Sequence, residues 1–411
     1  MHRCSQTIGA QAHGIDRVSE LEATPASTPA SADTSSIFRK AVRVFASCAA
    51  LFLLLNISLI LVDFPKIDSY PALHVKKLRY SSMNNVFRSE GYSRFWINRY
   101  GLADIEPAPV DDRSIFRIAF LGDSYVEAVQ VSQKARFSNL VPRLLPTPSG
   151  HRTIEGWNYG FSGDNTGNAY ARWKYLAQQI GFNRAVFAFT DQDLTENQAV
   201  DVSGPSGAFL RHESGHGYQL DESRIPTDIR QFEWELKGIF GRLFSSLYQL
   251  RVRTTELLTR ERARYARLFR QLDQRAAPGA ASPATIKHAV KPNAANETCE
   301  QLKFVYGQIL RSGTPTIILG LPSAHTVFPK EYDADPSRRN GYRDVMACLR
   351  HAGIEVADPL EQIEESIQHG RDPYRDWTQP GGHYNELGHR IIAEVLAQSL
   401  TDQTTKLSGA K

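Results

Sequence analysis

The longest apolar stretch of the chain covers residues 44–62, VFASCAALFLLLNISLILV, and contains no charged side chain over its nineteen residues. About 20 helical residues are needed to cross a bilayer core of roughly 30 Å. Two arginines and a lysine at 39–43 precede the stretch and Asp63 follows it, which favours a cytoplasmic N-terminus and an extracytoplasmic remainder. A signal peptide is the alternative, but no small-residue cleavage site follows residue 62. The pattern predicts a single-pass membrane protein anchored through residues 41–63, with its folded part in the periplasm if the source is bacterial.

The segments around this anchor differ in pattern. Residues 1–40 lack a sustained apolar period, and residues 24–27 (TPAS) are repeated at once as 28–31, so we expect a disordered cytoplasmic tail. Residues 64–113 are expected to form a juxtamembrane connecting segment. The folded domain is then expected over 114–400, followed by a short tail, 401–411.

Short apolar runs alternate with helical patterns in the second part of the chain. Four runs are typical of buried strands: residues 117–121 (RIAFL), 185–190 (AVFAFT), 316–321 (TIILGL) and 354–357 (IEVA). Continuous apolar runs suit strands covered on both faces, and helices between them imply right-handed crossovers in a parallel sheet. The sequence therefore predicts an α/β domain with a central parallel sheet.

A long insertion interrupts this alternation. Apolar residues recur at helical spacing from 228 to 250, and the pattern continues to 272, which predicts an inserted helical arm over about residues 226–275. Residues 251–275 hold eight arginines and three acidic residues, a net charge of +5. Such a face is usually only solvated; the alternative is contact with anionic lipid headgroups or an acidic polymer. Residues 276–296, rich in Pro and Ala, are expected to be a flexible loop.

Composition narrows the function classes. Of the 411 residues 41% are apolar, which excludes a wholly disordered chain, and 48 Lys and Arg against 44 Asp and Glu leave a net charge of +4. So small a surplus gives no reason to expect a nucleic-acid partner. The four cysteines lack the CxxC spacing of a zinc site, so no metal or other cofactor is expected. Cys299 and Cys348 would both lie on the oxidising side of the membrane, either as a disulfide or as two buried thiols.

Three short blocks carry residues suited to catalysis. In residues 120–125 (FLGDSY) an apolar strand ends in Gly-Asp-Ser, which places Ser124 where ligands of parallel sheets bind; the simpler interpretation is an N-cap of the next helix. His383 precedes an amphipathic helix that Asn385 is suited to cap, a position that suits a general base, although a solvated loop histidine has the same pattern. Residues 158–166 (NYGFSGDNT) offer backbone N–H groups to an oxyanion, or form an ordinary turn. His389, within the helix, is expected to be structural.

Taken in chain order, the segments FLGDSY, FSGDNT and HYNELGHRIIAEVL resemble the sequence blocks of the SGNH (GDSL) hydrolase family. Residues 96–102 (WINRYGL) are also similar to a segment of its membrane-anchored bacterial members. The resemblance covers about residues 114–200 and 300–400. It implies a flavodoxin-like three-layer sandwich, to which the helical arm and the N-terminal helix are additions. It also implies that Ser124 is the nucleophile, that His383 is the base, and that the backbone amides of Ser124 and Gly163 are oxyanion donors.

Two positions depart from the family pattern. Where the family has an Asn oxyanion donor after its third strand, this chain has Gln192, the third predicted donor, whose carboxamide lies one methylene further from the backbone. Where the family usually has Asp two or three residues before the histidine, this chain has Pro380 and Gly381. Asp376 is the preferred orienting acid and Asp372 a second candidate, while a Ser–His dyad without an acid is the alternative.

The leading hypothesis is a membrane-tethered, extracytoplasmic serine esterase or O-acyltransferase that acts on small esters or on acylated cell-surface glycans. Hydrolysis and transfer share an acyl-enzyme and differ only in the acceptor. The second hypothesis is a catalytically silent SGNH domain that binds a glycan or a protein partner. The third is an assembly protein whose arginine-rich segment, 251–275, binds membrane or an acidic polymer.

Overall fold

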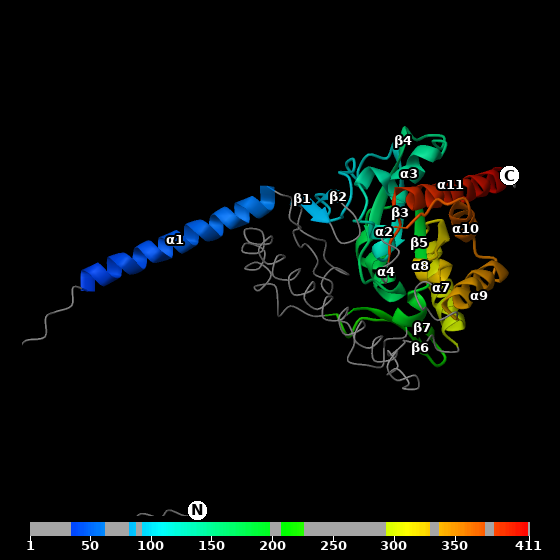
Figure 1. Ribbon diagram of the computed structural model, residues 1–411. Coiled ribbons are helices and arrows are strands. Elements are labelled where there is room, and N and C mark those ends of the chain that lie inside the picture. The colour runs from blue at the N-terminus through cyan, green and yellow to red at the C-terminus, as the bar shows by residue number, and fades with distance from the viewer. Residues whose placement is uncertain are drawn as a thin grey trace, which may run out of the picture. The chain divides into compact units, whose positions relative to one another are not determined.

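The computed structural model describes residues 34–61, 82–87, 93–197, 207–225, 293–328, 337–374 and 382–409 (Figure 1). The chain divides into two compact units, residues 1–54 and 55–411, and the candidate chemistry belongs to the second. Several predictions lie outside the described residues: the disordered tail over residues 1–33, the helical arm at 226–275, most of the loop at 276–296, and the position of Asp376.

A single long helix, α1 (Thr34–Leu61), contains most of the predicted anchor. Its exposed side chains include a run of five apolar residues, 51–55 (LFLLL). The prediction of disorder through residue 40 was wrong at its end, because residues 34–40 are helical. No Gly or Pro separates them from the apolar stretch, and extending a helix that has already nucleated is far easier than starting one. Within the described residues, no helix is both long and apolar enough to cross a membrane.

The central sheet of the described domain is entirely parallel. Its strands lie in the order β4 (Thr153–Gly160), β3 (Ile115–Gly122), β5 (Arg184–Thr190), β8 (Thr316–Leu321) and β9 (Val356–Ala357). This order, 2-1-3-4-5, is that of flavodoxin-like folds. The four predicted strands are present, with ends shifted by no more than two residues. The prediction of a parallel α/β sheet is confirmed.

Strand β4 was not predicted. Its sequence, TIEGWNYG, interrupts the apolar residues with Glu155, Gly156 and Asn158, so it shows neither a continuous apolar run nor a clean alternation. It pairs along its whole length with β3 at one edge of the sheet. The segment read from the sequence as a turn, residues 158–166, is therefore the end of an edge strand followed by a turn.

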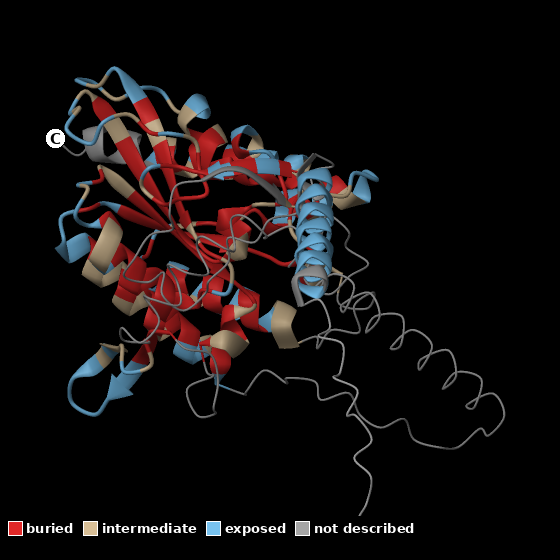
Figure 2. Ribbon diagram, turned by 90° about the vertical axis from the view of Figure 1, so that its left-hand side faces the viewer, coloured by how far each residue is buried: buried red, intermediate tan, exposed pale blue. Residues whose placement is uncertain are grey.

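Helices cover both faces of the sheet, which gives three layers. On one face α3 (Phe137–Leu144) and α11 (Glu386–Gly409) pack against each other and, with α10 (Leu360–Gln368), contribute to one apolar cluster. On the other face α4 (Thr166–Arg172), α7 (Ala294–Arg311) and α9 (Ser337–His351) contribute to a second. Buried residues accordingly concentrate along the strands and on the helix sides that face them (Figure 2). The remaining helices are short: α2 (Ser124–Glu127), η2 (Gln133–Ala135), η3 (Trp173–Ala177), α5 (Asp193–Glu196) and α8 (Ala324–Val327).

Two antiparallel hairpins lie outside the sheet, β1 (Ser82–Phe87) with β2 (Ser93–Ile97), and β6 (Phe209–Glu213) with β7 (Gly217–Asp221). The first hairpin lies within residues 64–113, the predicted juxtamembrane connecting segment. Phe95 and Ile97 are buried in a small cluster with Ala103, against which Val129 packs. In β2 buried and exposed residues alternate, the pattern of a strand with one face on a core.

Two predicted boundaries were also wrong. Helix α7 begins at Ala294, inside the predicted loop 276–296. Asn293 stands at the N-cap position, two alanines follow it, and Glu297 lies in the first turn, all favourable at a helix start. Helix α11 continues to Gly409, through most of the predicted tail 401–411. No Pro or Gly stops it before that point.

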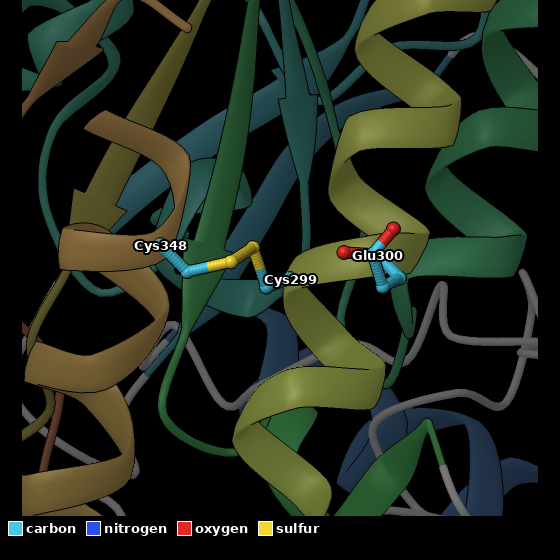
Figure 3. Close-up of side chains that lie close together, drawn as sticks. All are labelled: Cys299, Glu300 and Cys348. Carbon is cyan, nitrogen blue, oxygen red and sulfur yellow. A yellow bond between two sulfur atoms is a disulfide. The ribbon is translucent and has the colours of Figure 1, made fainter. Parts of the chain in front are cut away.

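A disulfide joins Cys299 of α7 to Cys348 of α9, with a Cα–Cα distance of 6.4 Å (Figure 3). The sequence alone was compatible with a disulfide or with two buried thiols, because Cys299 is near the start of its helix and Cys348 is near the end of its own. The two helices pack against each other, so these positions meet. Glu300 lies beside the bridge, but sulfurs bonded to each other are not thiolate ligands, and this group is not a metal site.

Candidate active site

Ser124 is the first residue of α2, and a single residue, Asp123, separates it from the end of β3. Gly122 has no room for a side chain, because a Cβ there would lie 2.5 Å from Val126 Cγ2. Asp123 caps α2: its Oδ1 accepts a 2.9 Å hydrogen bond from the Tyr125 N–H. The N-cap that the sequence offered as the simpler interpretation is therefore present at Asp123, and it sets Ser124 at the carboxyl end of the strand.

His383 meets Ser124 across the site. The distance from His383 Nε2 to Ser124 Oγ is 2.8 Å, a hydrogen-bond length, although 259 residues separate the two in sequence. For the serine hydroxyl to donate to Nε2, a neutral imidazole carries its proton on Nδ1. Both side chains are half-buried, so they are held by the protein yet remain open to a ligand. A serine bonded to an imidazole in this way has the arrangement of a nucleophile with its base.

The loop that carries His383 is fixed at several points. Gln130 Nε2 donates to the Tyr384 carbonyl at 3.2 Å, and the Tyr384 hydroxyl donates to the Pro322 carbonyl at 2.5 Å. Asn385 then caps α11, its Oδ1 accepting from the N–H groups of Leu387 and Gly388 at 2.9 and 3.1 Å. The predicted cap at Asn385 is confirmed, and it orients the helix that follows the histidine.

His389, one turn into α11, is fully buried and stacks on Phe137 with ring centroids 5.6 Å apart. Its Nδ1 accepts a 3.4 Å hydrogen bond from the Phe137 N–H. These contacts lie in the packing between α11 and α3, which agrees with the structural role expected from the sequence.

The three predicted oxyanion donors follow three neighbouring parallel strands. Ser124 follows β3, Gly163 follows β4, and Gln192 follows β5. Since the carboxyl ends of parallel strands share one edge of a sheet, all three belong to the same rim. Gly163 is exposed and has φ +83°. Gln192 is half-buried, and its carbonyl accepts hydrogen bonds from the N–H groups at the start of α5.

Two aspartates were candidates for the acid that orients His383. Asp376, the preferred candidate, lies outside the described residues. Asp372 is half-buried, its Oδ1 accepts a 2.9 Å hydrogen bond from the Tyr374 N–H, and burial raises the pKa of its carboxyl. Asp372 is thus engaged with the backbone of its own loop.

Sequence reasoning missed a group of buried acids at this rim. Asp123 Oδ2 accepts from the Thr190 hydroxyl at 3.1 Å, and Asp193 accepts from the Thr190 N–H at 3.0 Å and the Thr166 hydroxyl at 3.2 Å. Burial raises the pKa of Asp123 to about 6, against the opposing attraction of His383. Burial likewise raises the pKa of Asp193, and the charge of Asp123 adds to the effect. The available signal was positional, because Asp123 directly follows β3 and Asp193 comes three residues after the end of β5.

No family model matches the sequence, and no curated protein matches it. Among solved structures the chain is similar to an α/β hydrolase from the metagenome of Lake Arreo, Spain, with 14% identity over 69% of this chain and 94% of that one, and a TM-score of 0.37. It is similar to the acetyl xylan esterase AlAXEase, with 10% identity, coverages of 69% and 99%, and a TM-score of 0.37. It is also similar to a GDSL-like lipase from Bacteroides thetaiotaomicron, with 10% identity, coverages of 70% and 88%, and a TM-score of 0.34.

The last of these names the family whose blocks the sequence resembles.

Proposed function

We propose that this chain is a serine esterase or O-acyltransferase of the SGNH type. The observation that carries the proposal is the 2.8 Å hydrogen bond between Ser124 Oγ and His383 Nε2 at the carboxyl edge of the parallel sheet. The order of the three sequence blocks supports it, since they supply the serine, the turn at Gly163 and the histidine in turn.

The reaction then uses the chain's own groups. Ser124 Oγ attacks the ester carbonyl while its proton passes to His383 Nε2. The tetrahedral oxyanion accepts hydrogen bonds from the backbone amides of Ser124 and Gly163 and from the Gln192 carboxamide. When this intermediate collapses, the imidazolium returns the proton to the leaving alcohol and the acyl group stays on Ser124. Water or a sugar hydroxyl, deprotonated by His383, removes the acyl group in the second half of the reaction.

We further propose that the domain is tethered outside the cytoplasm and acts on ester-linked acyl groups, with acylated cell-surface glycans as the substrate class. Three observations support the location. Basic residues directly precede the apolar stretch at 44–62 and Asp63 directly follows it, the apolar side chains described along α1 are exposed, and the Cys299–Cys348 disulfide is typical of oxidising compartments. Deleting residues 1–63 is expected to release the protein from the membrane fraction; a deletion protein that stays with the membrane contradicts the tether.

A second function, a silent domain that binds a glycan or a partner, is favoured by one observation. Gln192 stands where an Asn donor is expected, and its longer side chain changes where the carboxamide reaches. Removing one well-aimed oxyanion donor lowers kcat by about 10²–10³-fold, so a misplaced Gln192 would leave the site nearly inactive.

Turnover of p-nitrophenyl acetate separates the two functions. The full chain and its Ser124→Ala variant are compared at equal folded concentration, with thermal unfolding as the check on folding. An active wild type and a variant reduced to the background rate support the enzyme. Equal rates in the two proteins contradict it and favour the binding function, which glycan titration then tests directly.

A further inference from the structure

Glu127 connects the helix that carries Ser124 to the turn that carries Gly163. Its side chain is buried, with 2% of the residue exposed. Its Oε2 accepts two hydrogen bonds from Ser162, one from the backbone N–H at 2.9 Å and one from the hydroxyl at 2.5 Å. Glu127 is the last residue of α2, three residues after Ser124. A buried carboxylate needs such bonds to offset its desolvation, so the pair is a fixed contact.

The turn itself has two accessible forms. The Phe161 carbonyl accepts a 3.0 Å hydrogen bond from the Asp164 N–H, with Ser162 and Gly163 at the two central positions. Gly163 has φ +83°, while Ser162 is not among the described residues with positive φ, which defines a type II turn. In a type I turn the peptide between the central residues is rotated by roughly 180°, and glycine permits either form. The direction of the Gly163 N–H therefore depends on what holds Ser162.

Other contacts fix the ends of the turn but not its middle. Gly160, at the end of β4, lies so close to α2 that a Cβ there would be 2.2 Å from the Glu127 nitrogen. The Phe161 N–H donates to the Gly122 carbonyl at 3.0 Å. At the other end Asp164 and Arg172 form a buried ion pair of 2.6 Å. Between these ends the two bonds to Glu127 hold Ser162, the residue directly before the central peptide, through its N–H and its hydroxyl.

From this geometry we infer that Glu127 is a positioning residue, which holds the Ser162–Gly163 peptide in the form that aims the Gly163 N–H at the oxyanion. The inference rests on the proposed function and adds to it a residue that touches neither substrate nor the Ser124–His383 pair. One four-residue helix then supplies the nucleophile at its start and orients an oxyanion donor from its end.

Kinetics of p-nitrophenyl acetate hydrolysis by full-chain variants tests this role. Glu127→Ala is expected to lower kcat by about 10²-fold, the effect of losing one oxyanion donor, with KM changed by less than about threefold. Glu127→Gln is expected to stay within about fivefold of wild type, because one amide oxygen can accept both bonds from Ser162. Ser162→Ala, which loses the hydroxyl bond, is expected to lower kcat in the wild-type background but not further in Glu127→Ala. Additive effects of the two alanine substitutions, or an unchanged kcat in Glu127→Ala, overturn the inference.

Glu155→Ala is the matched control. Glu155 is a partly buried carboxylate near the other end of β4, and it accepts hydrogen bonds from the Ala108 N–H and the Trp157 indole, each at 2.8 Å. Its loss is expected to lower the melting temperature and leave kcat within about twofold of wild type. If Glu127→Ala and Glu155→Ala lower kcat to the same extent, the role of Glu127 is only structural and the inference is wrong.

The NMR signal of the Gly163 amide tests the inference without relying on turnover, so its failure can be distinguished from a failure of the proposed function. In protein labelled with ¹⁵N-glycine, the Gly163 amide is identified as the signal lost in Gly163→Ala. Its resonance is expected to shift or split in Glu127→Ala and to stay in place in Glu127→Gln and Glu155→Ala. An unmoved signal in Glu127→Ala contradicts the inference even if the esterase is active. A moved signal supports the positioning of the turn by Glu127 even if the wild type fails to turn over the ester, a result that counts against the proposed function alone.

Discussion

Tyr125 lies against the imidazole of His383, with ring centroids 4.6 Å apart and ring planes inclined at 40°. Its hydroxyl also donates to the Gly382 carbonyl, at 3.4 Å. Tyr125 is the residue directly after Ser124, so the segment that presents the proposed nucleophile also supports the proposed base. The 2.8 Å bond between Ser124 and His383 is thus maintained from the α2 side as well as by the loop of His383.

Replacing Tyr125 by Leu is expected to lower kcat by about tenfold or more, because the imidazole loses its packing surface and populates other orientations. Tyr125→Phe keeps the ring and loses a long hydrogen bond, and is expected to remain within about threefold of wild type. Steady-state kinetics with p-nitrophenyl acetate measures both. Tyr342→Phe is the control, since it removes a 2.8 Å bond from the Tyr342 hydroxyl to Asp358 and is expected to affect melting temperature but not kcat. Equal kcat values for Tyr125→Leu and wild type would show that the ring does not position the histidine.

The buried acid Asp123 predicts a pH dependence of stability. Burial raises the pKa of its carboxyl from 3.8 to about 6, while the nearby charge of His383 lowers it and that of Asp191 raises it. The charge of Asp123 in turn raises the pKa values of Asp193 and Glu196. The folded state therefore favours the protonated form of Asp123. Its contribution to stability is complete below pH 3.8 and is lost as the pH rises through about 6.

Asp123→Asn removes this dependence and keeps a side chain suited to cap α2. Relative to wild type, the variant is expected to gain stability between pH 5 and pH 8, by at most about 3 kcal/mol. Melting temperatures measured across this range check the result. Asp112→Asn is the control. Hydrogen bonds from Ser114 lower the pKa of the Asp112 carboxyl, so the difference in melting temperature between Asp112→Asn and wild type is expected to be constant between pH 5 and pH 8. A constant difference for Asp123→Asn as well would be evidence against a protonated Asp123.

Sequence reasoning succeeded where the signal is local. Strands β3, β5 and β8 are continuous apolar runs, and a strand buried on both faces requires such a run. The cap at Asn385 was found for a similar reason, because capping depends on residues two or three positions away. Strand β4 was missed because it lies at the edge of the sheet and contains polar residues and glycines within its apolar pattern.

In the candidate site, too, the residues found from the sequence are those with a local signal. Ser124 and His383 were singled out because each lies beside a recognisable element boundary, and the family resemblance joined them across 259 residues. Glu127 and Tyr125 carried no such signal. Their importance comes from contacts with Ser162 and His383, which only the packing of β4 and the C-terminal loop against α2 creates. An acid at the end of a short helix is usually solvated, so no local rule would have selected Glu127.

The disulfide between Cys299 and Cys348 is expected to stabilise the domain without taking part in catalysis. It closes a loop over a sequence separation of 49 residues, which in the chain-entropy model corresponds to about 4 kcal/mol of stability. Cys299→Ala with Cys348→Ala is expected to lower the free energy of unfolding by an amount of that order, measured by denaturant titration, and to leave kcat per folded molecule unchanged. Cys48→Ala, at an exposed free cysteine in α1, is the control and is expected to match wild type. A double variant as stable as wild type would show that the bridge adds nothing.

The contact between Gly160 and α2 allows a test of the site's packing by a single methyl group. A Cβ at Gly160 would lie 2.2 Å from the Glu127 nitrogen and 2.6 Å from Val126 Cβ. The first of these is a backbone atom, so β4 or α2 has to shift by several tenths of an ångström. Gly160→Ala is therefore expected to lower both the melting temperature and kcat, the latter by about tenfold or more, because the shift separates the Gly163 turn from Ser124.

Gly307→Ala is the matched control, since the nearest atom to its Cβ would be Arg311 Nη1 at 3.6 Å. Gly307 lies within α7, where alanine favours the helix by up to about 1 kcal/mol, so this variant is expected to be slightly more stable and fully active. Melting curves and p-nitrophenyl acetate turnover of the two variants, side by side, give the comparison. If Gly160→Ala retains wild-type kcat, the end of β4 tolerates displacement, and the turn at Gly163 does not depend on close packing against α2.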